Sequence, residues 1–150
     1  MQKKTILLAV SVISLTLISS ASDRKYIVGP RPPDAQNLPF SDAVLVGDTL
    51  YLSGHIGIDP KTHQAASDPA VEAKLAMDGV KRTVESAGMT MDDIVSMQVF
   101  CTDMKQYDAF NEVYKSYFRG DYPARAFIGI DKLVRGARFE VMGIAVRKTK

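Results

Sequence analysis

The chain has 150 residues and a formal net charge of +2; 46% of its residues are hydrophobic and 24% are charged. The excess positive charge belongs to residues 1–21, because residues 22–150 carry 17 basic and 17 acidic side chains. This balance argues against a nucleic-acid partner, since binding to a phosphate backbone normally needs a basic surface. The single cysteine, Cys101, excludes an internal disulfide, and no histidine or cysteine cluster has the spacing of a metal site.

Residues 1–21 have the pattern of a secretory signal peptide. Two lysines precede an apolar run from Ile6 to Ile18, and Ser19–Ala21 offers small residues for cleavage. The run is shorter than the ~20 residues that a membrane-spanning helix needs, which disfavours the alternative of an uncleaved anchor. The sequence therefore predicts an exported protein, periplasmic or secreted, that has no membrane association after cleavage. Residues 22–150 have the length of one domain.

The first half of the mature chain predicts an extended lead-in and then a hairpin. Residues 22 to about 40 contain four prolines and little periodicity, which is typical of an extended segment. Val44–Val46 and Thr49–Ser53 flank Gly47-Asp48, as the two strands of a hairpin would.

A first helix is predicted from Asp68-Pro69 to about Ala87. Asp68 has the side chain of an N-cap, proline is favoured at the first helical position, and Gly88 is a typical C-terminal stop. Apolar residues at helical spacing predict the stripe that this helix buries: Val71, Leu75, Val80 and Val84.

The second half predicts three strands and a second helix. The strands are Ile94–Cys101, Arg125–Ile130 and Arg138–Val146, and the helix runs from about Met104 to Phe118. The helix has an aromatic and apolar stripe that reads as core: Tyr107, Phe110, Val113, Tyr114 and Tyr117. Few residues separate the last two strands, so they are expected to pair antiparallel.

The element order ββαβαββ predicts a two-layer α+β domain, a mixed sheet with two helices on one face. The last strand has apolar residues on both faces, with Phe139 and Val141 on one and Met142 and Ile144 on the other. Two helices cover only one face of the sheet. The other face is therefore expected to pack against sister subunits.

Arg125 is the strongest candidate for ligand binding. Pro123 cannot lie inside a central strand, so it marks the entry of a strand and places Arg125 at its mouth. A guanidinium stays charged at any relevant pH and matches a carboxylate with two parallel hydrogen bonds. The alternative is an ordinary arginine of a surface or interface.

Several short motifs lie at the ends of the predicted elements: Ser53-Gly54, Asn111 with Tyr114, Pro123-Ala124-Arg125, and Glu140 with Ile144-Ala145-Val146. In this combination, over about residues 26 to 148, the chain resembles the RidA/YjgF family of reactive-intermediate deaminases. The resemblance implies the family's chorismate-mutase-like fold, a homotrimer, and sites between subunits. It also implies hydrolysis of 2-imino acids or their enamine tautomers to 2-keto acids and ammonia, with no cofactor.

The resemblance also implies roles for particular residues. Arg125 would bind the substrate carboxylate, and the backbone at Phe127 would help to hold substrate and water. Ser53, Gly54 and Asn111 would line or support the pocket.

Three positions depart from the family's pattern. Phe40 stands where a tyrosine is common, and Phe127 replaces a frequent cysteine. Met142 stands where active deaminases have the glutamate that activates water, and a thioether cannot act as a general base. Glu140 lies two residues before Met142, about 6.6 Å away along the strand, which is too far for simple substitution. It is interpreted as a structural carboxylate paired with a neighbouring arginine.

Other titratable residues are read as structural. His55, where the family often has glutamine, could titrate near neutral pH, but a hydrogen-bonded structural histidine is favoured. Cys101 is expected to be a buried thiol on the Val95, Met97 and Val99 face. His63 carries no functional signal.

Two functions fit this sequence. One is an exported imine or enamine deaminase of reduced or altered activity that uses Arg125. The other is a trimer that binds small carboxylates, or a partner, without turnover, which Met142 favours. Action on RNA, described for some relatives, is a third choice because the mature chain has no excess of basic residues.

Overall fold

The structure is a computed structural model that describes residues 23–30 and 37–148. The predicted signal peptide and part of the predicted lead-in lie outside these residues. Within the described ranges, no helix has the length and apolar character needed to cross a bilayer.

One mixed six-stranded sheet forms the first layer, with the strand order β1-β2-β3-β6-β4-β5. Neighbouring strands pair antiparallel except β4 and β5, which are parallel. The strands are β1 (Arg24–Ile27), β2 (Ala43–Val46), β3 (Thr49–Ile56), β4 (Ile94–Cys101), β5 (Ala124–Gly129) and β6 (Phe139–Val146).

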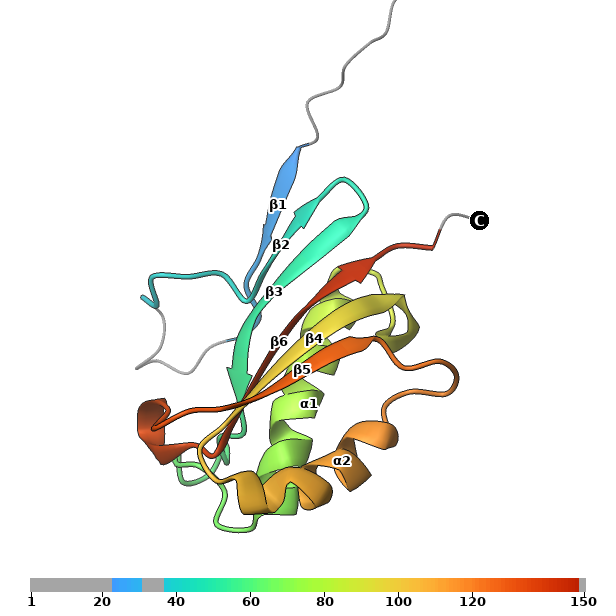
Figure 1. The fold of residues 1–150 in the computed structure, drawn as a ribbon. Helices are drawn as coiled ribbons and strands as arrows, with labels where there is room; N and C mark the ends of the chain where they lie inside the picture. The colour runs from blue at the N-terminus through green and yellow to red at the C-terminus, as the bar shows by residue number, and fades with distance from the viewer. Residues whose placement is uncertain (1–22, 31–36, 149–150) are drawn as a thin grey trace, which may run out of the picture.

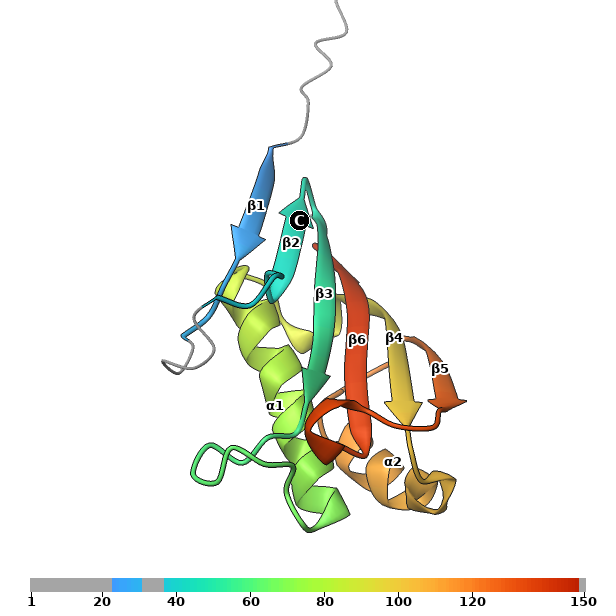
Figure 2. The ribbon, with the colours of Figure 1, turned by 90° about the vertical axis from the view of Figure 1, so that its left-hand side faces the viewer.

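Two helices form the second layer. They are α1 (Pro69–Ser86) and α2 (Tyr107–Lys115), and Figure 1 and Figure 2 show both on the same face of the sheet. Short 3₁₀ turns occupy Met91–Asp93, Met104–Gln106 and Val134–Gly136. The predicted two-layer α+β fold, with a mixed sheet and both helices on one face, is confirmed.

The predicted pairing of the last two strands is wrong. The strand β6 lies between β3 and β4, whereas β5 pairs with β4 at the edge of the sheet. The central place suits β6 because apolar residues occupy both of its faces. The edge suits β5, which follows Pro123 and has mostly exposed residues.

The predicted lead-in contains a strand that the sequence analysis missed. The strand β1 pairs with β2 at the other edge of the sheet, and Figure 2 shows it beside the β2–β3 hairpin. Its first three residues are exposed and only Ile27 is buried. Such a strand has no alternation of apolar and polar residues, which is the usual sequence signal.

The predicted bounds of α1 are confirmed, but its predicted buried stripe is partly wrong. Asp68 Oδ1 accepts the N–H groups of Ala70 at 2.8 Å and Val71 at 3.0 Å, and Gly88 has φ +70° just beyond the C-cap. Val71 is 50% exposed. The face that packs on the sheet carries instead Glu72, Ala73, Ala76, Met77, Val80 and Val84. Small alanines let the helix approach the strands closely.

The core lies between the sheet and the helices. Its largest fully buried apolar side chains are Phe110, Phe139, Leu50, Met77, Met97, Val80, Val84, Val99 and Val141. Cys101 is buried as predicted, but Val95 is 47% exposed and does not share its face. A register shift between Ile94 and Ser96 in the pairing of β4 with β6 reverses the alternation there.

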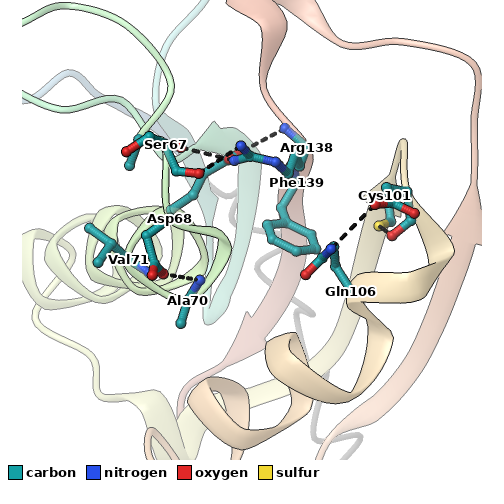
Figure 3. Close-up of polar contacts among 11 residues, drawn as sticks. Ser67, Asp68, Ala70, Val71, Cys101, Gln106, Arg138 and Phe139 are labelled. Carbon is teal, nitrogen blue, oxygen red and sulfur yellow. Dashed lines mark hydrogen bonds and ion pairs between the residues drawn. The ribbon is translucent and has the colours of Figure 1, made fainter.

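A buried ion pair ties α1 to the start of β6. Glu72 is fully buried, and its carboxylate pairs with the Arg138 guanidinium and accepts the backbone N–H of Phe139 at 3.1 Å. Arg138 also donates to the carbonyl oxygens of Ala66 and Ser67, each at 2.8 Å. Figure 3 shows Arg138 beside Ser67 and Asp68 at the start of α1. This network sets where β6 enters the sheet.

Candidate functional site

A cavity of about 290 Å³ lies where the edge strand β5 meets α2. Aromatic rings, a proline and one amide surround a guanidinium there; the lining residues are Asn111, Tyr114, Lys115, Tyr122, Pro123 and Arg125. Arg125, the residue predicted to anchor a carboxylate, lines this cavity, and Asn111 lies beside it.

Arg125 is held by an amide and by aromatic rings rather than by a carboxylate. Its Nη2 donates to Asn111 Oδ1 at 2.8 Å, and its Cζ lies 4.5 Å from the centroid of the Tyr114 ring. No ion pair formed among the described residues includes Arg125. The guanidinium keeps its positive charge and has further N–H donors for an anionic ligand.

The Phe127 ring packs inward, so the side chain does not line the cavity. It contacts Phe110 and Tyr107 with ring centroids 5.5 Å and 4.9 Å away. Ile130 N–H donates to Cys101 O, and backbone groups alternate in direction along a strand. The N–H and C=O groups of Arg125 and Phe127 therefore point to the open edge of the sheet. That geometry is compatible with the predicted backbone role of Phe127.

Met142 and Arg125 lie on opposite faces of the sheet. The buried residues of β6, Val141 and Gly143, face the helices, so Met142 faces away from them. Arg125 and Phe127 contact residues of α2 and therefore lie on the helix side. The structure does not bring the predicted anchor and the predicted base position together within one chain.

The remaining predicted pocket residues lie near β3. Ser53 Oγ donates to Ser41 O at 2.7 Å, and Phe40 is 50% exposed. A Cβ at Gly54 would lie 1.8 Å from Glu140 Oε1, so only glycine leaves room for that carboxylate. These residues are not beside Arg125 in a single chain.

The predicted arginine partner of Glu140 is wrong. Its carboxylate packs over Gly54 and belongs to none of the ion pairs formed among the described residues. Arg138, the arginine two residues before Glu140, pairs with Glu72 instead. Residues two apart on a strand share a face, but Arg138 lies before the start of β6, and its side chain turns toward Glu72 of α1 and not toward Glu140.

His55 is a structural histidine, as favoured. Its Nδ1–H donates to Ser53 O at 2.8 Å, because a carbonyl can only accept, and Nε2 then accepts from Thr83 Oγ1 at 2.9 Å. Burial lowers the pKa of His55 below its ordinary value of 6.5, and the Ser53 hydrogen bond opposes this effect. The ring is therefore neutral near pH 7 and joins β3 to α1.

Cys101 behaves as the sequence analysis expected. Burial raises the pKa of its thiol, and the thiol donates to Asp103 O at 3.1 Å. Among the described residues, no three or more of the His, Cys, Asp and Glu side chains gather as a metal site.

Tyr114 is a residue of the cavity that the sequence analysis assigned only to the core. It lies one helical turn after Asn111, and this i, i+3 spacing places both on the same face of α2. That spacing is the signal that would have found it.

Comparisons with known proteins agree on one family. A family model described as Endoribonuclease L-PSP matches residues 31–147. The 2-iminobutanoate/2-iminopropanoate deaminase of Mus musculus is 38% identical over 125 residues, 83% of this chain and 92% of the mouse protein. The protein of that name from Homo sapiens is 36% identical, covering 83% of this chain and 90% of its own length.

Solved structures show the same likeness. The crystal structure of the E. coli YjgF gene product has a TM-score of 0.75 at 32% identity, covering 83% of this chain and 99% of that one. E. coli TdcF with bound serine has a TM-score of 0.74 at 33% identity, covering 83% of this chain and all of that one.

Proposed function

Because the chain belongs to the RidA/YjgF family, we propose that it binds small 2-imino and 2-keto acids and hydrolyses the imines slowly. The observation that carries this proposal is Arg125, a guanidinium on a cavity wall whose contacts are an amide and aromatic rings. The curated relatives named as deaminases support the reaction class.

In the proposed reaction, Arg125 pairs with the substrate carboxylate and fixes the imine carbon beside it. The oxygen of one water adds to that carbon, the carbon–nitrogen bond breaks, and ammonia leaves with the protons that the water and the iminium supply. A 2-keto acid remains. The outward-facing backbone groups of Arg125 and Phe127 would hold the water at the open edge of β5.

Met142 is the reason to expect slow turnover. A positioned general base commonly contributes about 10²–10⁴-fold to rate, and a thioether has no basic oxygen. The same residue favours the second candidate function, a trimer that binds small carboxylates without turnover. Action on RNA, which the family description names, stays third because the mature chain balances its charges.

We also propose a homotrimer with the site between subunits. Arg125 and Met142 lie on opposite faces of the sheet, so one chain cannot place both around one ligand. The face without helices carries Tyr51 beside Ile144 in register, and Tyr51 is 49% exposed while Val146 is 38% exposed. Burying such apolar side chains in an interface would stabilise the assembly.

One preparation tests export and assembly together. Expressed in a bacterium with its own leader, the protein should be recovered outside the cytoplasm, with its N-terminus near Ser22. Light scattering should then give three times the mass of the mature chain. Cytoplasmic protein that begins at Met1 would refute export, and a stable monomer at micromolar concentration would remove the inter-subunit site.

Replacing Arg125 with alanine should weaken binding of 2-oxobutanoate by roughly 10- to 100-fold, because charged hydrogen bonds contribute ~1.5–3 kcal/mol. Calorimetric titration measures the affinity, and light scattering checks that the assembly is kept. Arg125→Lys should restore binding only partly, since an ammonium lacks the planar fork. Arg82→Ala, on the exposed side of α1, is the control. Equal affinities for Arg125→Ala and the unmodified protein would make Arg125 a structural residue.

A further inference from the structure

Tyr114 has a hydroxyl group without a hydrogen-bond partner. The residue is 4% exposed, and its oxygen is the one buried side-chain polar atom of the described residues that makes no hydrogen bond. Burying a hydroxyl without a hydrogen-bond partner costs free energy, so such groups are rare in folded proteins. Other tyrosines of this region do not share the feature, since Tyr117 donates to Asp78 Oδ1 at 2.6 Å.

The position of Tyr114 gives a reason for the unpaired hydroxyl. Tyr114 lines the 290 Å³ cavity, and its ring faces the guanidinium, with Arg125 Cζ 4.5 Å from the ring centroid. Burial raises the pKa of Tyr114 to about 12, although the charge of Arg125 opposes the shift. The hydroxyl therefore keeps its proton at physiological pH and can act as a donor.

Besides Asn111 and Lys115, whose ammonium pairs with Glu112 at 2.9 Å, the cavity has an apolar side. Tyr122 stacks on Tyr114 with ring centroids 6.5 Å apart, and Pro123 adds another apolar wall. Tyr122 is 58% exposed, which makes it the outer wall of the cavity. A ligand here would meet polar groups at one end and apolar rings along its side chain.

We propose that Tyr114 is a ligand-binding residue whose hydroxyl donates to an oxygen of the carboxylate that Arg125 holds. The ligand class is a 2-oxo or 2-imino acid with an apolar side chain, which packs against Tyr122 and Pro123. This inference rests on the proposed function of the Arg125 cavity and adds a second donor to it. In the unliganded protein the hydroxyl stays unpaired, and the bound carboxylate satisfies it.

The test compares Tyr114→Phe with Tyr117→Phe by thermal unfolding and calorimetric titration. Tyr114→Phe should weaken binding of 2-oxobutanoate about 10-fold, because one hydrogen bond to a charged group is lost. It should leave the unliganded protein at least as stable, since it removes a buried hydroxyl without a partner. Tyr117→Phe should do the opposite, lowering the melting temperature while the affinity stays unchanged, because it breaks a hydrogen bond within the fold.

Butanoate, which keeps the carboxylate and the apolar chain but has no 2-oxo group, tests whether the carboxylate accepts the Tyr114 hydrogen bond. Tyr114→Phe should weaken the binding of butanoate by the same factor. If Tyr114→Phe loses affinity for 2-oxobutanoate but not for butanoate, the carboxylate is not the group that accepts the Tyr114 hydrogen bond. Unchanged affinity for both acids in Tyr114→Phe, with the expected loss in Arg125→Ala, would refute the role of Tyr114 alone. Unchanged affinity for both acids in Arg125→Ala would refute the proposed function itself, the binding of small acids by Arg125.

Discussion

Replacing Met142 with glutamate should raise ammonia release from 2-iminopropanoate by about 10²–10⁴-fold, the usual contribution of a positioned general base. Methionine and glutamate have similar lengths, and Met142 faces away from the helices and from the core that lies between them and the sheet. The neighbours that it would meet are polar or half-buried, including Gln98 directly opposite on β4. The substitution therefore changes chemistry more than packing.

The assay uses freshly generated imine and protein that lacks residues 1–21, with Met142→Gln as the matched control. Glutamine has the shape of glutamate but no basic carboxylate, so its rate should stay near that of the unmodified protein. Adding Arg125→Ala to Met142→Glu should remove most of the gain if both residues serve one substrate. High activity in the unmodified protein would overturn the assignment of Met142. A folded, acid-binding Met142→Glu variant without faster turnover would mean that the site is built for another ligand.

Replacing Glu72 with alanine should lower the free energy of unfolding by about 3–5 kcal/mol, the typical cost of breaking a buried ion pair. The Glu72 side chain is fully buried, whereas that of Arg138 is 30% exposed. Removing the carboxylate leaves that guanidinium without its counter-charge. It also leaves the backbone N–H groups of Arg138 and Phe139 without their acceptor.

Urea denaturation followed by circular dichroism measures this change, provided that the slope of the transition stays constant. Glu85→Ala is the control, because Glu85 pairs with Lys81 at 3.9 Å on the exposed side of the same helix and should contribute little. The double variant Glu72→Leu with Arg138→Met should recover part of the lost stability, since it removes both charges but leaves the two backbone N–H groups without an acceptor. If Glu72→Ala and Glu85→Ala lower the free energy of unfolding equally, the buried ion pair contributes no more to stability than the exposed one.

Local chemistry was sufficient to predict several elements of this protein. The capping carboxylate of Asp68, Pro69 at the first helical position and Gly88 beyond the last turn define the bounds of α1 by interactions within a few residues. The strand β4 and the β2–β3 hairpin are likewise predicted by apolar runs and turn residues. The short motifs at the ends of the predicted elements, Pro123-Ala124-Arg125 among them, identified the family because they combine residues from several elements.

The tertiary structure alone decided the order of the strands and the pairing of the charged residues. The insertion of β6 between β3 and β4 depends on which strand best fills the centre of the sheet, a comparison among strands that no local pattern contains. Glu72 is buried because Arg138, 66 positions away, reaches its carboxylate. A prediction from helical periodicity places a glutamate on the exposed face of the helix, because the periodicity contains no information about partners from distant segments.

The same limit applies to the candidate site. Sequence motifs named Arg125 and Met142 together, but the alternation of β5 and β6 puts them on opposite faces of the sheet. The aromatic stripe of α2 read as core, and its burial was predicted correctly for Phe110 and Tyr114. That the Tyr114 hydroxyl lacks a partner beside Arg125 depends on the approach of α2 to β5. Contacts of this kind are made between elements, so only the packed structure determines them.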